Sequence, residues 1–189
     1  MPESMPFGSL WLPVVVSAVA VFVASSVVHM VLKYHKADYK PLPNEGEVAD
    51  AIRKGNPGPG YYVMPHCADM SEMKDPAVIA KYEKGPVGLV ALMAAGVPNM
   101  GKLLGLWFGF CLLLSFAIGY VARHTLSAAA DGLTVMRITG AIAFIGYGMT
   151  SIINSIWYGM PWSNTARSLL DAVIYAIVTG LAFRLLWPS

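Results

Sequence analysis

Three polar side chains lie at a similar depth inside apolar segments of the chain. His29 is near the end of the first segment, Asn154 near the end of the third and Asp171 near the start of the fourth. At about 1.5 Å of rise per residue, each lies about 6 Å inside its segment. Ionisable groups in a membrane span are costly and therefore point to function by default. If the three meet, we expect Asp171 to hold His29 in one tautomer or to relay protons with it.

These side chains support two interpretations. They predict a small transporter or proton-coupled module if they face a substrate path. They predict a structural polar core if Arg167, four residues before Asp171, pairs with it on the same helix face, and if Asn154 joins two helices. Polar contacts between membrane helices are routinely structural. We therefore expect a structural or interaction subunit, and keep His29, Asn154, Arg167 and Asp171 as candidates for transport.

A second group of reactive side chains lies in the segment 65–73. It contains His66, Cys67, Met70 and Met73. Sulfur ligands with an imidazole suit monovalent copper, and cysteine with histidine suits zinc, which predicts a metal-handling or redox protein. The segment lacks the paired spacing of common metal sites, so a turn whose side chains bind the backbone is favoured.

The sequence assigns no catalytic residue. Cys67 beside His66 has the chemistry of a nucleophile, but no motif of a particular enzyme class accompanies it. A haem held by two histidines would need a second histidine at the depth of His29, whereas His124 is predicted at the opposite end of the bundle from His29. An enzyme is therefore not favoured.

The composition predicts that lipid surrounds most of the chain. Of the 189 residues, 56% are hydrophobic and 13% charged, against about 25% charged in soluble proteins. Apolar segments long enough to cross a bilayer as helices cover residues 10–32, 102–122, 133–158 and 166–187. The expected fold is an all-α membrane protein with four transmembrane helices in a bundle. The first segment lacks the basic flank of a signal peptide and is predicted to be a retained span.

A loop of about 70 residues, 33–101, joins the first two spans, and loops over about 15 residues usually carry function or disorder. Asn44 with Glu47 predicts the start of a short helix, and Asp75 followed by Pro76 predicts a second one. The apolar runs 61–64 and 87–93 are expected either to pair as strands or to lie on the membrane surface.

The distribution of charge predicts an orientation. Nine of the 13 Lys and Arg residues lie between Lys33 and Lys102, which places the loop in the cytoplasm and both termini outside, in the periplasm of a bacterium. The basic residues alternate with acidic ones, and the net charge is +2, so a nucleic-acid partner is not expected. The expected partners are the lipid bilayer and a membrane or cytoplasmic protein, or a second copy of the chain.

Small residues repeat every fourth position at the start of the second span. Gly101, Gly105 and Gly109 would lie on one helix face and let another helix approach closely. We expect a helix-packing face, and a dimer interface is the alternative.

Several short sequence strings resemble a known group of proteins. They are 64–67 (MPHC), 73–76 (MKDP), 98–101 (PNMG), 156–159 (IWYG) and 186–188 (LWP). In this combination the chain resembles a group of small, uncharacterised bacterial polytopic inner-membrane proteins. The resemblance implies a bacterial inner-membrane location but no activity.

Overall fold

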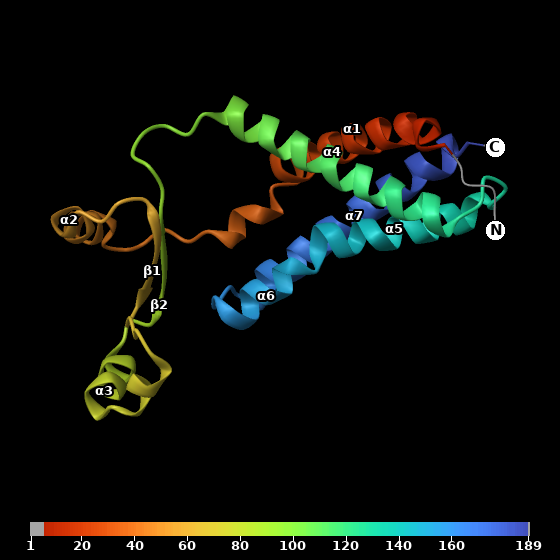
Figure 1. Ribbon diagram of the computed structural model, residues 1–189. Helices are drawn as coiled ribbons and strands as arrows, with labels where there is room; N and C mark the ends of the chain where they lie inside the picture. Colours follow the sequence, from red (N-terminus) through yellow and green to blue (C-terminus); the bar gives the residue numbers. More distant parts are fainter. Residues whose placement is uncertain (1–5, 189) are drawn as a thin grey trace. The chain divides into compact units, whose positions relative to one another are not determined.

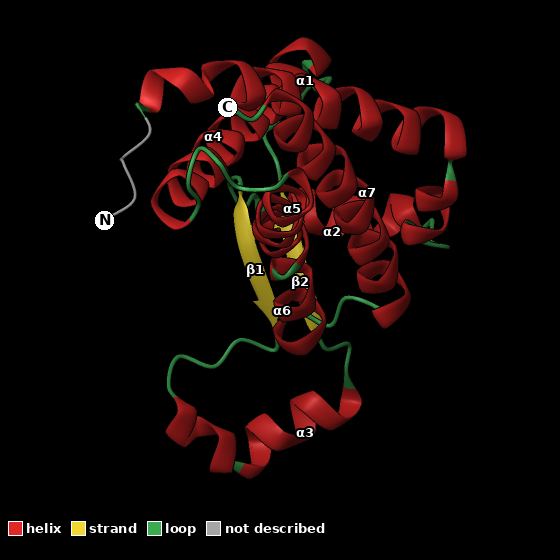
Figure 2. Cartoon of the chain, turned by 90° about the vertical axis from the view of Figure 1, so that its right-hand side faces the viewer, coloured by secondary structure: helices red, strands yellow, loops and turns green. Residues whose placement is uncertain are grey.

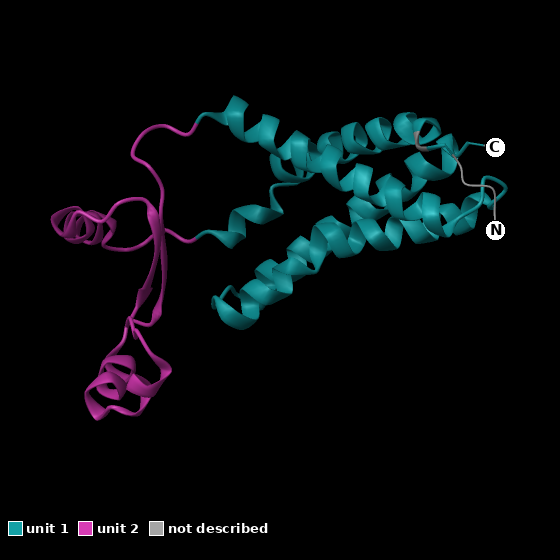
Figure 3. Ribbon diagram, viewed as in Figure 1, with its two compact units in different colours: residues 1–39, 99–189 teal, residues 40–98 magenta. Residues whose placement is uncertain are grey.

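The computed structural model describes residues 6–188, and the protein is mostly helical (Figure 1). It divides into two compact units (Figure 3). The helical unit contains the chain up to Tyr39 and from Asn99 onward, and the smaller unit contains Lys40–Pro98.

The helical unit contains four helices that are long and apolar enough to cross a membrane, as the sequence predicts. They cover Gly8–Leu32, Met100–Thr125, Gly132–Trp157 and Trp162–Leu186. The first consists of the 3-10 helix η1 (Phe7–Leu10), α1 (Trp11–Val27) and the π-helical turn η2 (Val28–Leu32). The second is α4 (Met100–Thr125) and the fourth is α7 (Trp162–Leu186).

The third of these helices is not continuous. It consists of α5 (Gly132–Gly148) and α6 (Thr150–Trp157), which meet at Met149. Gly146 and Gly148 immediately precede this junction, and glycine weakens a helix because it leaves the backbone free. The apolar run 133–158 alone predicts one unbroken helix here.

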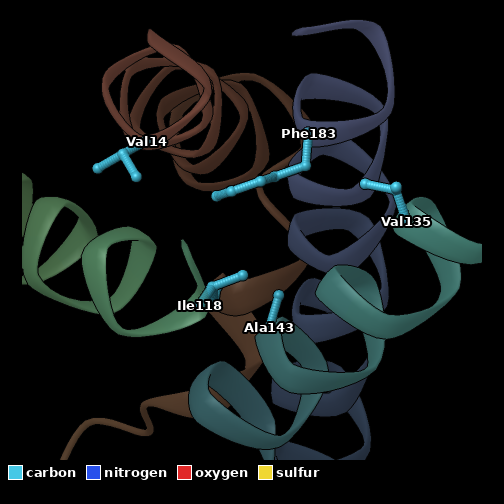
Figure 4. Close-up of a cluster of buried hydrophobic side chains, with 5 residues drawn as sticks. All are labelled: Val14, Ile118, Val135, Ala143 and Phe183. Carbon is cyan, nitrogen blue, oxygen red and sulfur yellow. The ribbon is translucent and has the colours of Figure 1, made fainter. Parts of the chain in front are cut away.

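The core of the helical unit lies where α7 packs against α1 and α5, and α1 against α4. Its buried side chains include Val14, Ile118, Val135, Ala143 and Phe183 (Figure 4). Many large apolar side chains on the outer helix faces are exposed. Exposed apolar area on this scale is unfavourable in water, so these faces suit a hydrocarbon environment.

Close approach between helices occurs at glycines of α5 and α7. A methyl group at Gly148 would lie 2.6 Å from the Cβ of Ala172, and one at Gly180 would lie 2.8 Å from the carbonyl oxygen of Met136. By contrast, a methyl group at Gly105 or Gly109 would meet no described atom within 4 Å. At Gly101 it would meet only Asn99 of the same segment, at 3.4 Å. Within the described chain, the predicted glycine face of α4 is therefore not a close helix contact.

The smaller unit contains helices and a pair of strands. Its elements are α2 (Glu45–Gly55), β1 (Gly60–Met64), the 3-10 helix η4 (Met70–Lys74), α3 (Pro76–Lys84) and β2 (Gly88–Leu92). The strands are antiparallel, from Gly60 opposite Leu92 to Met64 opposite Gly88 (Figure 2). The all-α prediction is therefore too narrow. The two short apolar runs satisfy their backbone groups by pairing with each other.

The segment after the first long helix belongs to the helical unit. Lys33 has a left-handed backbone with φ of 55°, and the chain then forms the 3-10 helix η3 (Tyr34–Asp38), which packs against α7. The hydropathy pattern alone predicts that these residues belong to the long loop. Their position beside α7 determines the candidate site.

Candidate functional site

The carboxylate of Asp171 is the centre of a polar cluster in the helical unit. It lies on α7 and is only 6% exposed. The Tyr34 hydroxyl donates a hydrogen bond to Oδ1, and His35 Nε2 lies 2.8 Å from Oδ2. His29 Nε2 is 4.0 Å from the same Oδ2. These neighbours offset the cost of burying a carboxylate.

Both ring nitrogens of His35 face carboxylates. Nδ1 lies 2.5 Å from Oδ2 of Asp38, and Nε2 faces Asp171. The other oxygen of Asp38 accepts a hydrogen bond from Arg167 Nη1 at 2.5 Å. The carboxylates of Asp38 and Asp171 therefore lie between the guanidinium of Arg167 and the imidazoles of His35 and His29.

The local fold holds η3 against α7. The Asn164 side chain donates to the backbone carbonyl of Asp38 at 3.2 Å, close to the ion pair of Asp38 with Arg167. The predicted pairing of Arg167 with Asp171 is therefore wrong. A carboxylate from η3 reaches the guanidinium, and Asp171 binds Tyr34 and His35 instead.

His29 occupies the end of the first long helix. Its Nδ1 lies 3.0 Å from the carbonyl oxygen of Ser25. A carbonyl only accepts hydrogen bonds, so Nδ1 carries the proton and Nε2 is left as the basic nitrogen. The ring stacks on that of His35, with centroids 4.5 Å apart and planes 3° from parallel.

Of the candidates predicted at this depth, the structure gathers His29, Arg167 and Asp171 and leaves out Asn154. Asn154 lies on α6, where its backbone carbonyl accepts hydrogen bonds from Tyr158 and Met160. Its side chain is not among the groups that meet at Asp171. In the described residues, the ligand atoms of His29, His35 and Asp171 lie within 4.8 Å of one another, as a shared metal ion would require.

Tyr34 is held as a hydrogen-bond donor. Burial, followed by the hydrogen bond to Asp171 and the negative charges of Asp171 and Asp38, raises the pKa of its hydroxyl well above the ordinary value. The phenol therefore keeps its proton across the physiological range.

A pocket of about 600 Å³ adjoins the cluster. Its polar lining comes from Ser25, Ser26, His29, Ser168 and Asp171, and the rest is apolar or aromatic: Met30, Met100, Leu104, Trp107, Tyr147 and Tyr175. The indole of Trp107 donates to the Ser25 hydroxyl at 2.8 Å. The Tyr175 hydroxyl is buried without a hydrogen-bond partner among the described residues.

The predicted metal segment lies in the smaller unit, and the structure brings only part of it together. Cys67 Sγ is 3.7 Å from the Met73 sulfur and 3.6 Å from the Tyr82 hydroxyl, whereas Met70 is 82% exposed. Asp69 accepts a hydrogen bond from the Ser71 amide at 2.7 Å, which lowers the pKa of its carboxyl. The metal prediction for His66, Cys67, Met70 and Met73 stays a prediction.

Sequence reasoning missed Tyr34, His35 and Asp38. Their signal is present, because histidine and aspartate stand three residues apart directly after the first apolar segment. That spacing places two side chains on one face of a helical turn.

No protein-family model, curated protein or solved structure matches this chain. The fold itself defines the class: a mostly helical protein with four helices long and apolar enough to cross a membrane, consistent with a multi-pass membrane protein. The resemblance to small bacterial inner-membrane proteins stays a prediction.

Proposed function

We propose that the chain crosses a membrane four times as a helical bundle and binds a small amphipathic molecule in the pocket beside Asp171. The four long helices and their exposed apolar faces support the membrane assignment. The lysines that flank the first long helix and α4 support a cytoplasmic position for the pocket end and a bacterial inner-membrane orientation with both termini outside.

One observation carries the binding proposal. Ser25, Ser26, His29, Ser168 and Asp171 supply polar groups to a pocket that is otherwise lined by apolar and aromatic side chains. Its volume of about 600 Å³ lies within the usual range of small-molecule sites. This combination suits a ligand with an oxygen-bearing head group and a hydrocarbon body.

The buried hydroxyl of Tyr175 also supports this proposal. Tyr175 lines the pocket one helical turn after Asp171, and its hydroxyl has no partner among the described residues. A buried hydroxyl without a partner costs about 1–3 kcal/mol. A ligand oxygen that reaches this hydroxyl would recover part of that cost, so we expect the head group to accept a hydrogen bond.

Among the functions predicted from the sequence, a small transporter that uses His29 and Asp171 agrees with this pocket. A purely structural or interaction subunit requires no such cavity. Binding is the step that a transporter and any other small-molecule function would share, so we test binding first.

The test uses Trp107, which lines the pocket, as a fluorescent reporter. The full-length protein in lipid nanodiscs is titrated with 11-bromoundecanol, whose bromine quenches tryptophan fluorescence. We expect saturable quenching that Trp107→Phe removes. Bromoundecane, which lacks the head group, should quench without saturation, because it can only partition into the lipid.

A matched pair of variants tests the location. Leu104→Phe narrows the pocket and should weaken saturable quenching about tenfold, whereas Leu103→Phe on the same helix does not line it and should have no effect. Equal quenching in wild type and Leu104→Phe, or quenching that never saturates, would contradict the proposal.

A further inference from the structure

We infer that His29, His35 and Asp171 form a binding site for a divalent transition-metal ion, for which zinc is the best-matched probe. The site goes beyond the proposed pocket function and does not depend on the identity of the pocket ligand. It also differs from the sequence-predicted metal segment, since all three ligands belong to the helical unit.

The two histidines already have the outer hydrogen bonds of metal ligands. Histidines that bind metals almost always donate their second ring N–H to a carbonyl or carboxylate, which fixes the ring and its tautomer. His29 Nδ1 does so to the Ser25 carbonyl at 3.0 Å, and His35 Nδ1 to Asp38 at 2.5 Å. In each ring, Nε2 is the nitrogen turned to the shared centre.

Asp171 is also oriented by a hydrogen bond to one of its carboxylate oxygens. Its Oδ1 accepts the hydrogen bond of Tyr34, which leaves Oδ2 toward the two Nε2 atoms. Asp38, which orients His35, is itself held by Arg167. Each of the three ligands is therefore fixed by a hydrogen bond on the atom that would not contact the metal.

The distances require only small movements. Bonds of about 2.0–2.1 Å in a tetrahedral zinc site place ligand atoms about 3.3 Å apart. His35 Nε2 and His29 Nε2 lie 2.8 and 4.0 Å from Asp171 Oδ2, and all three ligand atoms lie within 4.8 Å of one another. The separations between ligand atoms must therefore change by at most about 1.5 Å. The rings are stacked, and His29, whose side chain is 52% exposed, has room to tilt toward the ion.

Metal binding replaces one proton. In the present arrangement a proton joins His35 Nε2 to Asp171 Oδ2. When M²⁺ binds, both atoms donate electron pairs to the ion, and this proton leaves to solvent. With a proton on each ring nitrogen of His35, the charges of His35, Arg167, Asp38 and Asp171 sum to zero. Loss of one proton and binding of a divalent ion change this total to +1.

The donor set selects the class of metal. Two imidazoles and one carboxylate suit zinc and iron(II), whereas magnesium and calcium prefer oxygen ligands and monovalent copper prefers sulfur. Three protein ligands leave a coordination position open, as in catalytic rather than structural zinc sites. His29 and Asp171 also line the pocket, so we place the open position toward the pocket.

The test measures zinc binding to full-length protein in detergent. The protein is stripped with a chelator, separated from it, and titrated calorimetrically with zinc chloride. We expect one zinc per chain, and a loss of more than about 100-fold in affinity for His35→Ala and Asp171→Asn, which exceeds the effect of losing an outer contact. Circular dichroism during heating reports whether each variant is folded.

A second pair of variants keeps the test decisive if Asp171→Asn fails to fold. His29→Gln removes a half-exposed ligand, and His124→Gln changes a histidine whose Nδ1 makes the same contact, to the carbonyl four residues before it, at 2.7 Å. Loss of zinc in His29→Gln with retention in His124→Gln supports the site. Unchanged binding in folded His29→Gln, loss of binding in Cys67→Ser, or no binding by the wild type would overturn it.

Discussion

His35 Nε2 lies 2.8 Å from Asp171 Oδ2, although 136 residues separate the two in the chain. The contact joins the short η3 helix to α7. It places a second histidine beside a buried carboxylate that already has His29 and Tyr34 as neighbours. This juxtaposition turns a set of separate polar residues into one centre that adjoins a pocket.

Loss of Arg167 should destabilise the segment that carries His35. Arg167→Gln leaves the partly buried carboxylate of Asp38 without the guanidinium that pairs with it. We expect the free energy of unfolding to fall by about 1–3 kcal/mol, the usual cost of leaving a buried polar group without its partner. Arg53→Gln is the control, because Arg53 pairs with Asp50 over the same 2.5 Å on an exposed surface, where such pairs contribute about 0–1 kcal/mol. Unfolding in a detergent and denaturant series measures both. Similar losses in the two variants would be inconsistent with an anchoring role for Arg167.

Removal of the Asp38 carboxylate should weaken zinc binding without removing a ligand. Asp38→Asn loses the charge that orients His35, and losses of about 10- to 100-fold are typical for such outer contacts. Asp50→Asn, at an exposed ion pair of the smaller unit, should leave zinc affinity unchanged. Calorimetric titration distinguishes them. Full zinc affinity in Asp38→Asn would show that this contact does not orient a metal ligand.

Glycines with and without close neighbours should respond oppositely to a methyl group. Gly180→Ala places Cβ 2.8 Å from the Met136 carbonyl oxygen. We expect this overpacking to lower the free energy of unfolding by about 1–3 kcal/mol. Gly105→Ala has free space around it within the described chain and should be neutral or stabilising by up to about 1 kcal/mol, because alanine favours a helix more than glycine does.

The Gly105→Ala variant also tests whether the glycine face of α4 is a dimer interface, the alternative that the sequence leaves open. Unfolding in detergent is combined with size-exclusion chromatography and light scattering. If Gly105→Ala destabilises the protein and converts a dimer to a monomer, the predicted homo-oligomer contact lies on this face. An unchanged mass and stability would remove that alternative.

The cap of α5 predicts a pH dependence at the other end of the helical unit. Hydrogen bonds from Thr134, its side chain first and then its backbone, lower the pKa of Asp131. A carboxyl whose folded pKa lies below the unfolded value of about 3.9 stabilises the fold above that value, and its contribution disappears as pH falls through the folded pKa. The melting temperature of Asp131→Ala should therefore lie below that of wild type at pH 7, and the gap should close below about pH 4. A gap independent of pH would refute the role of the ionised cap.

The elements within the smaller unit differ in how far local pattern predicts them. Asp75 accepts a hydrogen bond from the Ala77 amide at the start of α3, as its position before Pro76 suggests. Asn44 makes no such bond at the start of α2, and its side-chain amide contacts Glu47 instead. The pairing of β1 with β2 depends on two segments meeting, which neither segment specifies alone.

The sequence by itself determined the four apolar helices, because a run of about 20 apolar residues in lipid must satisfy its backbone groups within one helix. It also marked His29 and Asp171 as unusual, since ionisable groups in such a run are costly. Only the tertiary structure decided their partners. The left-handed turn at Lys33 returns η3 to α7, so Tyr34, His35 and Asp38 meet Asp171 and Arg167. These contacts join residues more than 120 positions apart, and local periodicity carries no information about such distant pairs.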